Sequence, residues 1–240
     1  MESFTRTTHE GELLHYCLRV IQQPERARAC GFGANSSADR RPLDPPPVIE
    51  LQVLQQANES SPFIDVTFSY QANFFLYAQL ESNKSQTSAV TLPPLLTGVC
   101  VGGVTYLNQP RRAGYFVFPD LAIKKEGTYR LRFSLFEESR ESPEVVSFRG
   151  SIQSDEFHVY SAKKFPGLRL STPISQTLAE QGCRVRNRKK TGNSPTTTTS
   201  RGERRRTVHS SSSSSSSPLE RAPLRLTYTR ADGRLKTIIA

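Results

Sequence analysis

The chain has 240 residues, a formal net charge of +10 and 35% hydrophobic residues, enough to bury one sizeable core but not two. The charge is concentrated at one end, because residues 184–240 carry 14 Lys or Arg against 3 Asp or Glu, while the remainder carries 18 against 19. We therefore expect one folded domain, residues 1–190, followed by a basic tail, residues 191–240. The apolar runs are far shorter than the roughly 20 residues of a membrane-spanning helix, so we expect no membrane association.

The sequence lacks the motifs that indicate catalysis or a bound cofactor. It has no GxSxG, no HExxH, no Walker-type phosphate loop and no dinucleotide fingerprint, since Gly31-Phe32-Gly33 opens no helix after a strand. The four cysteines and four histidines do not have zinc-ligand spacing. Residues 1–12 do not have the pattern of a secretory leader, so reduced thiols in an intracellular protein are expected. We expect no enzyme, no cofactor and no metal site.

Alternation of apolar and polar residues with a period of two predicts mostly strands. The predicted strands are 14–21, 49–53, 66–70, 73–80, 99–107, 115–118 and 127–136, with a last one that takes in Phe157, Val159 and Ile152. The pattern is clearest in 127–136, while 73–80 is apolar on both sides and favours a central strand. Residues 137–147 are acidic and contain Pro143, which predicts a solvated loop.

One helix is predicted late in the chain, with Thr172 as its N-cap, Pro173 in its first turn and Gly182 at its carboxyl end. Seven or more strands separated by turn residues predict an all-β fold, an antiparallel Ig-like β-sandwich. Residues 191–240 are rich in Ser, Thr and Arg and poor in large apolar residues, so we predict a disordered basic tail.

The first candidate site is a basic segment between the first two predicted strands. It contains Arg26, Arg28, Arg40 and Arg41 together with two glycines and five prolines, which predicts an ordered inter-strand loop that presents the arginines outward. Such a surface suits the phosphates of double-stranded DNA, and one arginine could reach a guanine edge. The alternative is a solvated loop whose arginines pair with Glu25, Asp39 and Asp44.

The second candidate is a pair of basic clusters in the tail. The first cluster is Arg184, Arg186, Arg188, Lys189 and Lys190, and the second includes Arg204, Arg205 and Arg206. Two basic blocks on a flexible spacer suit the acidic grooves of an import receptor (importin), which predicts nuclear import. The same charge would attract DNA loosely, and the alternative is a merely solubilising tail.

The aromatic residues are the third candidate. They follow strand periodicity, so core packing is the simplest interpretation, ahead of stacking on single-stranded bases. Two pairs, Phe74-Phe75 and Tyr115-Phe116, place apolar groups on both sides of their strands, so one side must be covered, and a second subunit could cover it.

Several strings resemble the fungal velvet regulators, and most closely their velvet A branch. They are ERARACG, SSADRRPLDPPPVIEL, DVTFSYQANFFLYAQLE, LTGVCVGGVTYLNQP, RAGYFVFPDLAIKKEGTYRLRFSLFEE and FHVYSAKKFPGLRLSTPISQTLAEQGCRVR, in that order between Phe4 and Arg188. The resemblance implies a sandwich similar to the Rel homology domain, DNA binding, and a heterodimer with a second velvet protein. It also implies a bridge to a methyltransferase-like regulator, residence in nucleus and cytoplasm, and control of sporulation, development and secondary metabolism. It further suggests an import signal within residues 26–41.

One departure from the resemblance concerns the middle of the basic segment. Where related members carry lysines, this chain has Ala34-Asn35-Ser36-Ser37, so a heterodimer partner would supply more of the phosphate contacts. Two hypotheses follow, a DNA-binding velvet regulator and a nuclear adaptor that binds no DNA itself. They differ in their dependence on salt, because binding through several phosphate contacts weakens steeply as salt rises.

Overall fold

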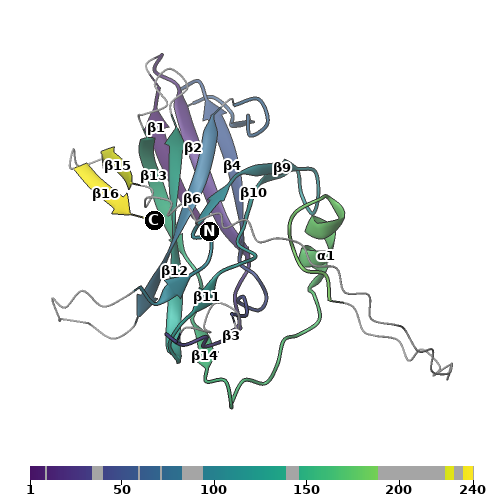
Figure 1. Cartoon of the computed structure of the whole chain (residues 1–240). Coiled ribbons are helices and arrows are strands. Elements are labelled where there is room, and N and C mark those ends of the chain that lie inside the picture. Colours follow the sequence, from purple (N-terminus) through teal and green to yellow (C-terminus); the bar gives the residue numbers. More distant parts are fainter. Residues whose placement is uncertain are drawn as a thin grey trace, which may run out of the picture.

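A computed structural model describes residues 1–8, 10–33, 40–58, 60–70, 72–82, 94–138 and 146–188, and two short strands at 225–229 and 235–239. Figure 1 shows two main sheets packed face to face, with one helix beside them. The predicted antiparallel β-sandwich with one late helix is confirmed.

The first sheet has six antiparallel strands. Their spatial order is β1 (Glu2–Thr7), β2 (Leu13–Gln22), β4 (Val48–Gln56), β10 (Ala113–Val117) and β9 (Thr105–Leu107), with β5 (Ile64–Asp65) paired to β4. In β2 the register places Leu18 opposite Leu51 and Tyr16 opposite Val53, so apolar side chains face the core together.

The second sheet has eight strands. Their order is β16 (Leu235–Ile239), β15 (Arg225–Thr229), β13 (Val146–Gln153), β12 (Gly127–Glu138), β14 (Phe157–Tyr160) and β3 (Arg26–Arg28), with β6 (Asn73–Ser82) paired to β12 and β8 (Val101–Gly103) paired to β6. Strands β7 (Leu96–Thr97) and β11 (Ala122–Ile123) form a separate two-stranded ribbon. Two pairs, β3 with β14 and β13 with β15, are parallel.

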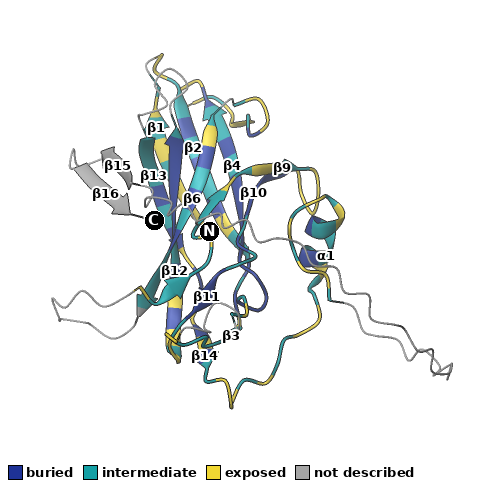
Figure 2. Ribbon diagram, viewed as in Figure 1, coloured by how far each residue is buried: buried dark blue, intermediate teal, exposed yellow. Residues whose placement is uncertain are grey.

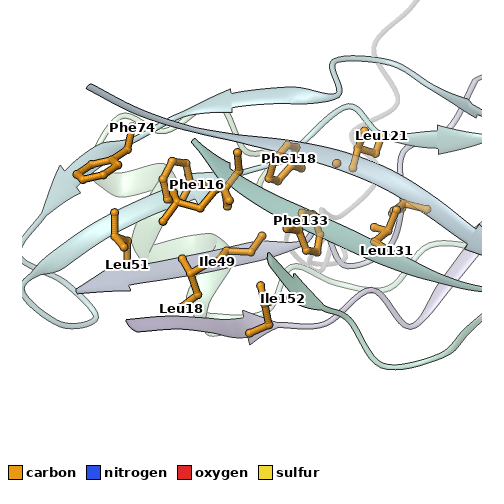
Figure 3. Packing of buried hydrophobic residues seen from close by; sticks show 14 of the residues in the cluster. Leu18, Ile49, Leu51, Phe74, Phe116, Phe118, Leu121, Leu131, Phe133 and Ile152 are labelled. Atoms are coloured by element: carbon orange, nitrogen blue, oxygen red, sulfur yellow. The ribbon is translucent and has the colours of Figure 1, made fainter. Parts of the chain in front are cut away.

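The core lies between the two sheets. In β12 the first half alternates as predicted, with Leu131 and Phe133 fully buried and Arg130 exposed. From Ser134 onward both faces are buried, because Phe136 on the outer face stacks on Phe75, with ring centroids 5.2 Å apart. Figure 3 shows the inward side chains of both sheets meeting, and Figure 2 shows that buried residues concentrate on the strands.

The helix α1 (Pro173–Glu180) covers the outer face of the first sheet. Thr172 accepts a hydrogen bond from the Ser175 amide at 3.1 Å, as expected of an N-cap, and Gly182 follows the helix with a positive φ of 89°. Leu178 is fully buried in a cluster with Tyr115. The chain's own helix therefore covers Tyr115, so this residue does not need a second subunit to cover it.

A buried carboxylate closes one end of the sandwich. Glu137 accepts hydrogen bonds from Tyr16 at 2.9 Å, Tyr70 at 2.6 Å and the Arg149 guanidinium at 2.5 Å. Burial would raise the pKa of Glu137, but these hydrogen bonds and the Arg149 charge outweigh burial and hold the pKa below its usual value. Because the folded pKa is depressed, the network stabilises the fold at neutral pH and weakens as pH falls through the folded pKa.

Three local predictions are wrong. Residues 66–70 are not a strand, because Thr67 hydrogen-bonds to Asp65 and the amide of Tyr70 donates to the Val66 carbonyl, which closes a turn. Residues 99–107 are divided between β8 and β9, which belong to different sheets. Glu137 belongs to β12 and not to a solvated loop.

Other differences concern strands β1, β13, β15 and β16. The strand β1 was not predicted, and Ile152 lies on a different strand, β13, from Phe157 and Val159 on β14. The turn between them is fixed by Ser154, whose hydroxyl and amide bond to the Leu131 backbone. Strands β15 and β16 lie within the segment for which disorder is predicted, and the rest of that segment lies outside the described residues.

A testable prediction concerns Gly150, where β1 meets β13. A Cβ at this position would overlap the ring of Phe4, so Gly150→Ala must displace Phe4 from the edge of the core. We expect a loss of about 1–3 kcal/mol in the free energy of unfolding, measured by urea denaturation. Gly103→Ala is the matched control, because an added Cβ there meets nothing within 4 Å. Equal stability of the two variants would contradict the packing of Phe4 over Gly150.

Candidate nucleic-acid interface

The basic segment begins as a strand, which corrects the predicted inter-strand loop. Strand β3 runs parallel to β14, with Arg26 opposite His158 and Arg28 opposite Tyr160. Ala27, between the two arginines, is fully buried in the main core. The Arg-Ala-Arg alternation thus reflects one core-facing residue between two that face away from it. That short alternation was the available signal for a strand.

The four predicted DNA-binding arginines, here called the arginine edge (Arg26, Arg28, Arg40 and Arg41), have different environments. One amino group of Arg40 donates to both carboxylate oxygens of Asp120, each at 2.8 Å. The guanidinium of Arg26 lies 3.9 Å from Glu25, and its side chain is only 17% exposed.

The remaining two arginines of the edge differ in their exposure. Arg28 is half-buried beside Tyr160 on the parallel strand. Arg41 is exposed and forms no ion pair within the described part of the chain. The prediction that pairs these arginines with Asp39 concerns a residue outside the described ranges. Two cations of the edge are therefore partly neutralised by the protein's own carboxylates, and Arg41 is freely presented to solvent.

Asp44 is the buried hub that ties the edge to the rest of the molecule. Its backbone exchanges hydrogen bonds with Arg26, at 3.0 Å and 2.9 Å, and extends the pairing of β3. Its carboxylate, 3% exposed as a residue, accepts from the Arg169 amide at 2.7 Å and from the Arg188 guanidinium at 3.1 Å. Arg169 also forms an ion pair with Glu25. The chain that follows β14 is thus bonded at Arg169 and Arg188 to Asp44, beside the arginine edge.

The first predicted import cluster is split by this arrangement. Arg184 and Arg186 are exposed, whereas Arg188 is held by Asp44, and its backbone pairs with Ser171 in both directions, at 3.1 Å and 2.7 Å. The other predicted import residues, Lys189, Lys190, Arg204, Arg205 and Arg206, lie outside the described residues. Their role stays a prediction.

Sequence reasoning missed Asp120 and Arg169. Asp120 lies 80 residues from its partner Arg40, and Arg169 lies 144 residues from Glu25, so no local spacing signals either contact. Asp44 was named as a partner of the arginines, but it pairs with Arg188, which had been assigned to import.

The rest of the described surface offers little that resembles a catalytic centre. A cavity of about 260 Å³ beside the end of α1 is lined by residues such as Gly102, Cys183 and Arg184, and its lining includes no carboxylate and no histidine. Among the described residues, no three His, Cys, Asp or Glu side chains gather in a way that could hold a metal ion. In the same part of the chain, no helix is long and apolar enough to cross a membrane.

Comparison with known proteins identifies the family. The model of the velvet factor family matches residues 16–93 and 82–192, which together cover most of the chain. The chain belongs to the velvet family. The predicted resemblance is thereby confirmed.

Relatives of this velvet-family chain carry closely similar names. The chain is 51% identical over 207 aligned residues to the developmental and secondary metabolism regulator ve-1 of Neurospora crassa. It is 49% identical over 215 residues to the regulator veA of Aspergillus flavus and 50% identical over 204 residues to ve1 of Gibberella zeae, both named developmental and secondary metabolism regulators. These matches support the velvet A branch. They cover 77–78% of this chain but only 37–38% of each relative's own length.

The hub role of Asp44 gives a testable prediction. Asp44→Asn removes the charge that holds Arg188 and one acceptor for the Arg169 amide. We expect a loss of about 1.5–3 kcal/mol in the free energy of unfolding and faster tryptic cleavage at Arg169. Asp155→Asn, at an exposed residue, is the control for loss of a carboxylate. If both variants were cleaved at the wild-type rate, Asp44 would not be fastening the segment.

Proposed function

We propose that this velvet-family chain is a transcriptional regulator that pairs with a second velvet protein and binds double-stranded DNA through the arginine edge. In this role it would control fungal development, including sporulation, and secondary metabolism. The observation that carries the proposal is the parallel pairing of β3 with β14, which holds Arg26 and Arg28 in fixed positions on a sheet edge. Arginines whose backbone is fixed in this way can meet phosphates without the cost of ordering a loop.

The ion pairs of the edge bear on how tightly it can bind. Asp120 occupies the Arg40 guanidinium, so a phosphate must compete with a carboxylate that is already in place. Arg41 is exposed and forms no ion pair with any residue that the structure describes. The proposal therefore assigns the first phosphate contact of this chain to Arg41, and further contacts to the partner in the heterodimer.

The competing function is an adaptor that binds no DNA, and joins a velvet partner to a methyltransferase-like regulator. The neutralised state of Arg26 and Arg40 favours it, because the edge then has less free charge than its four arginines suggest. Neither function includes catalysis or a cofactor, in keeping with relatives named as regulators.

The first prediction for this function uses loss and gain of charge at the edge. We expect Arg28→Ala with Arg41→Ala to weaken binding of duplex DNA, and to reduce the slope of log affinity against log salt by about one per lost contact. Asp120→Asn should release Arg40, and should therefore strengthen binding of duplex DNA and increase the salt slope. Binding is measured by fluorescence anisotropy, on the chain alone and with a velvet partner.

The control for charge is Arg111→Ala with Arg112→Ala, in the exposed turn between β9 and β10. It removes two cations far along the chain from the edge. Because Arg112 also lies 4.4 Å from the centre of the Phe68 ring, an unchanged free energy of unfolding is checked before its DNA binding is compared. If the wild-type chain shows no DNA binding, alone or with its partner, the adaptor takes the place of the DNA-binding regulator.

We also propose import by importin through the two basic clusters, with residence in nucleus and cytoplasm. Exposure of Arg184 and Arg186 supports the first cluster. The prediction is that Arg204, Arg205 and Arg206, changed together to alanine, reduce nuclear accumulation of a fluorescent fusion. A fusion that accumulates as before would remove the tail from the import signal.

A further inference from the structure

The chain leaves the arginine edge along a path that is held on both sides. After β3, the Ala29 amide donates to the Tyr160 carbonyl at 2.8 Å. The next two amides turn to the other neighbour, with Cys30 bonded to the Ile123 carbonyl at 3.0 Å and Gly31 to the Lys124 carbonyl at 3.0 Å. Residues 29–31 therefore lie between the end of β14 and the end of β11. Figure 1 shows β3, β11 and β14 at the same end of the molecule.

Each of those two neighbours continues directly into a pair of lysines. Lys124 and Lys125 follow β11, and Lys163 and Lys164 lie in the turn after β14, which the Lys164 amide closes on the Ser161 carbonyl at 3.2 Å. We call these four residues the lysine platform. Because residues 29–31 are bonded to both strand ends, the two pairs flank the path by which the chain leaves Arg28.

The platform is exposed and its charge is not neutralised locally. Lys125, Lys163 and Lys164 are exposed, and no lysine of the platform forms an ion pair with any residue that the structure describes. This differs from the edge itself, where Arg40 is held by Asp120. Unpaired ammonium groups attract a polyanion without first giving up a carboxylate.

An exposed aromatic residue lies at the same place. Phe32 follows Gly31 and is 54% exposed, and the Lys124 ammonium lies 5.6 Å from the centre of its ring. This cation–π contact restrains Lys124 on the surface without cancelling its charge. The site thus combines fixed backbone, four cations and an uncovered ring on one end of the molecule.

We propose that the lysine platform is part of the DNA-binding surface and that its four ammonium groups contact phosphates on both sides of Arg28. The inference rests on the proposed function, because it extends the arginine edge to residues outside the basic segment. It also compensates for the partial neutralisation of the arginine edge. The platform supplies four cations, which lie far from residues 26–41 in sequence. Lysine contacts to phosphate carry no base information, so the platform adds affinity and not sequence preference.

The test measures anisotropy of two labelled duplexes of unrelated sequence, on the full chain with its velvet partner, over roughly 50–200 mM salt. The variants are Lys124→Ala with Lys125→Ala, and Lys163→Ala with Lys164→Ala. We expect each double variant to lower the salt slope by about two and to weaken both duplexes by the same factor. Lys163→Arg with Lys164→Arg should keep the wild-type slope.

The matched control is again Arg111→Ala with Arg112→Ala, which removes the same charge elsewhere. If the lysine variants behave like this control while Arg28→Ala with Arg41→Ala still weakens binding, the platform is overturned and the proposed function stands. If the wild-type chain binds neither duplex, both are overturned. If the lysine variants bind DNA as the wild type does but lose binding to anionic lipid vesicles, the proposal is overturned, because the four lysines would then bind a membrane surface.

Discussion

The carboxylate of Asp44 is the constraint on which the basic end of this molecule depends. It is buried, and it joins the strand that carries Arg26 to two positions much later in the chain, Arg169 and Arg188. A buried carboxylate is costly unless its oxygens are bonded to donors, so these partners must stay in place for the fold to be stable. The consequence is that Arg26 and Asp44, near the two ends of the basic segment, are paired with each other beside β14.

The same ion pairs that order the basic edge also limit its charge. Arg40 is positioned by Asp120, and Arg26 lies beside Glu25. The carboxylates that hold these two side chains in place also neutralise part of their positive charge. An exposed pair of this kind contributes little stability, and a phosphate can displace the carboxylate at modest cost. An arginine edge and a separate lysine platform would then have different roles, the first giving orientation and the second giving charge.

The extent to which the sequence predicts this structure depends on whether a contact is local. Strand β12 was predicted because in its first half one face meets the core and the other meets water, and α1 was predicted because Thr172 and Pro173 mark its start. The turn at residues 66–70 has the same alternation as a strand, and the hydrogen bond between Thr67 and Asp65 outweighs that pattern.

The candidate site was predictable only in part, for the same reason. Residues 26–41 stand out as basic in the sequence, but the partners that decide how much charge is free come from Asp120, Arg169 and Arg188. These contacts span 80 to 144 residues and leave no periodicity or spacing in the sequence. Only the fold brings them together, and the lysine platform is assembled in the same way.

The central claim, that Asp44 fixes the basic end, is tested most directly by hydrogen exchange of individual amides. The amides of Arg26, Asp44 and Arg169 all bond within this hub. They should exchange slowly and together, at rates close to those of the core strand β12. Rapid exchange at Arg169 and Arg26 beside a protected β12 would contradict the account, because the arginines would then lie on a segment that opens independently of the sandwich.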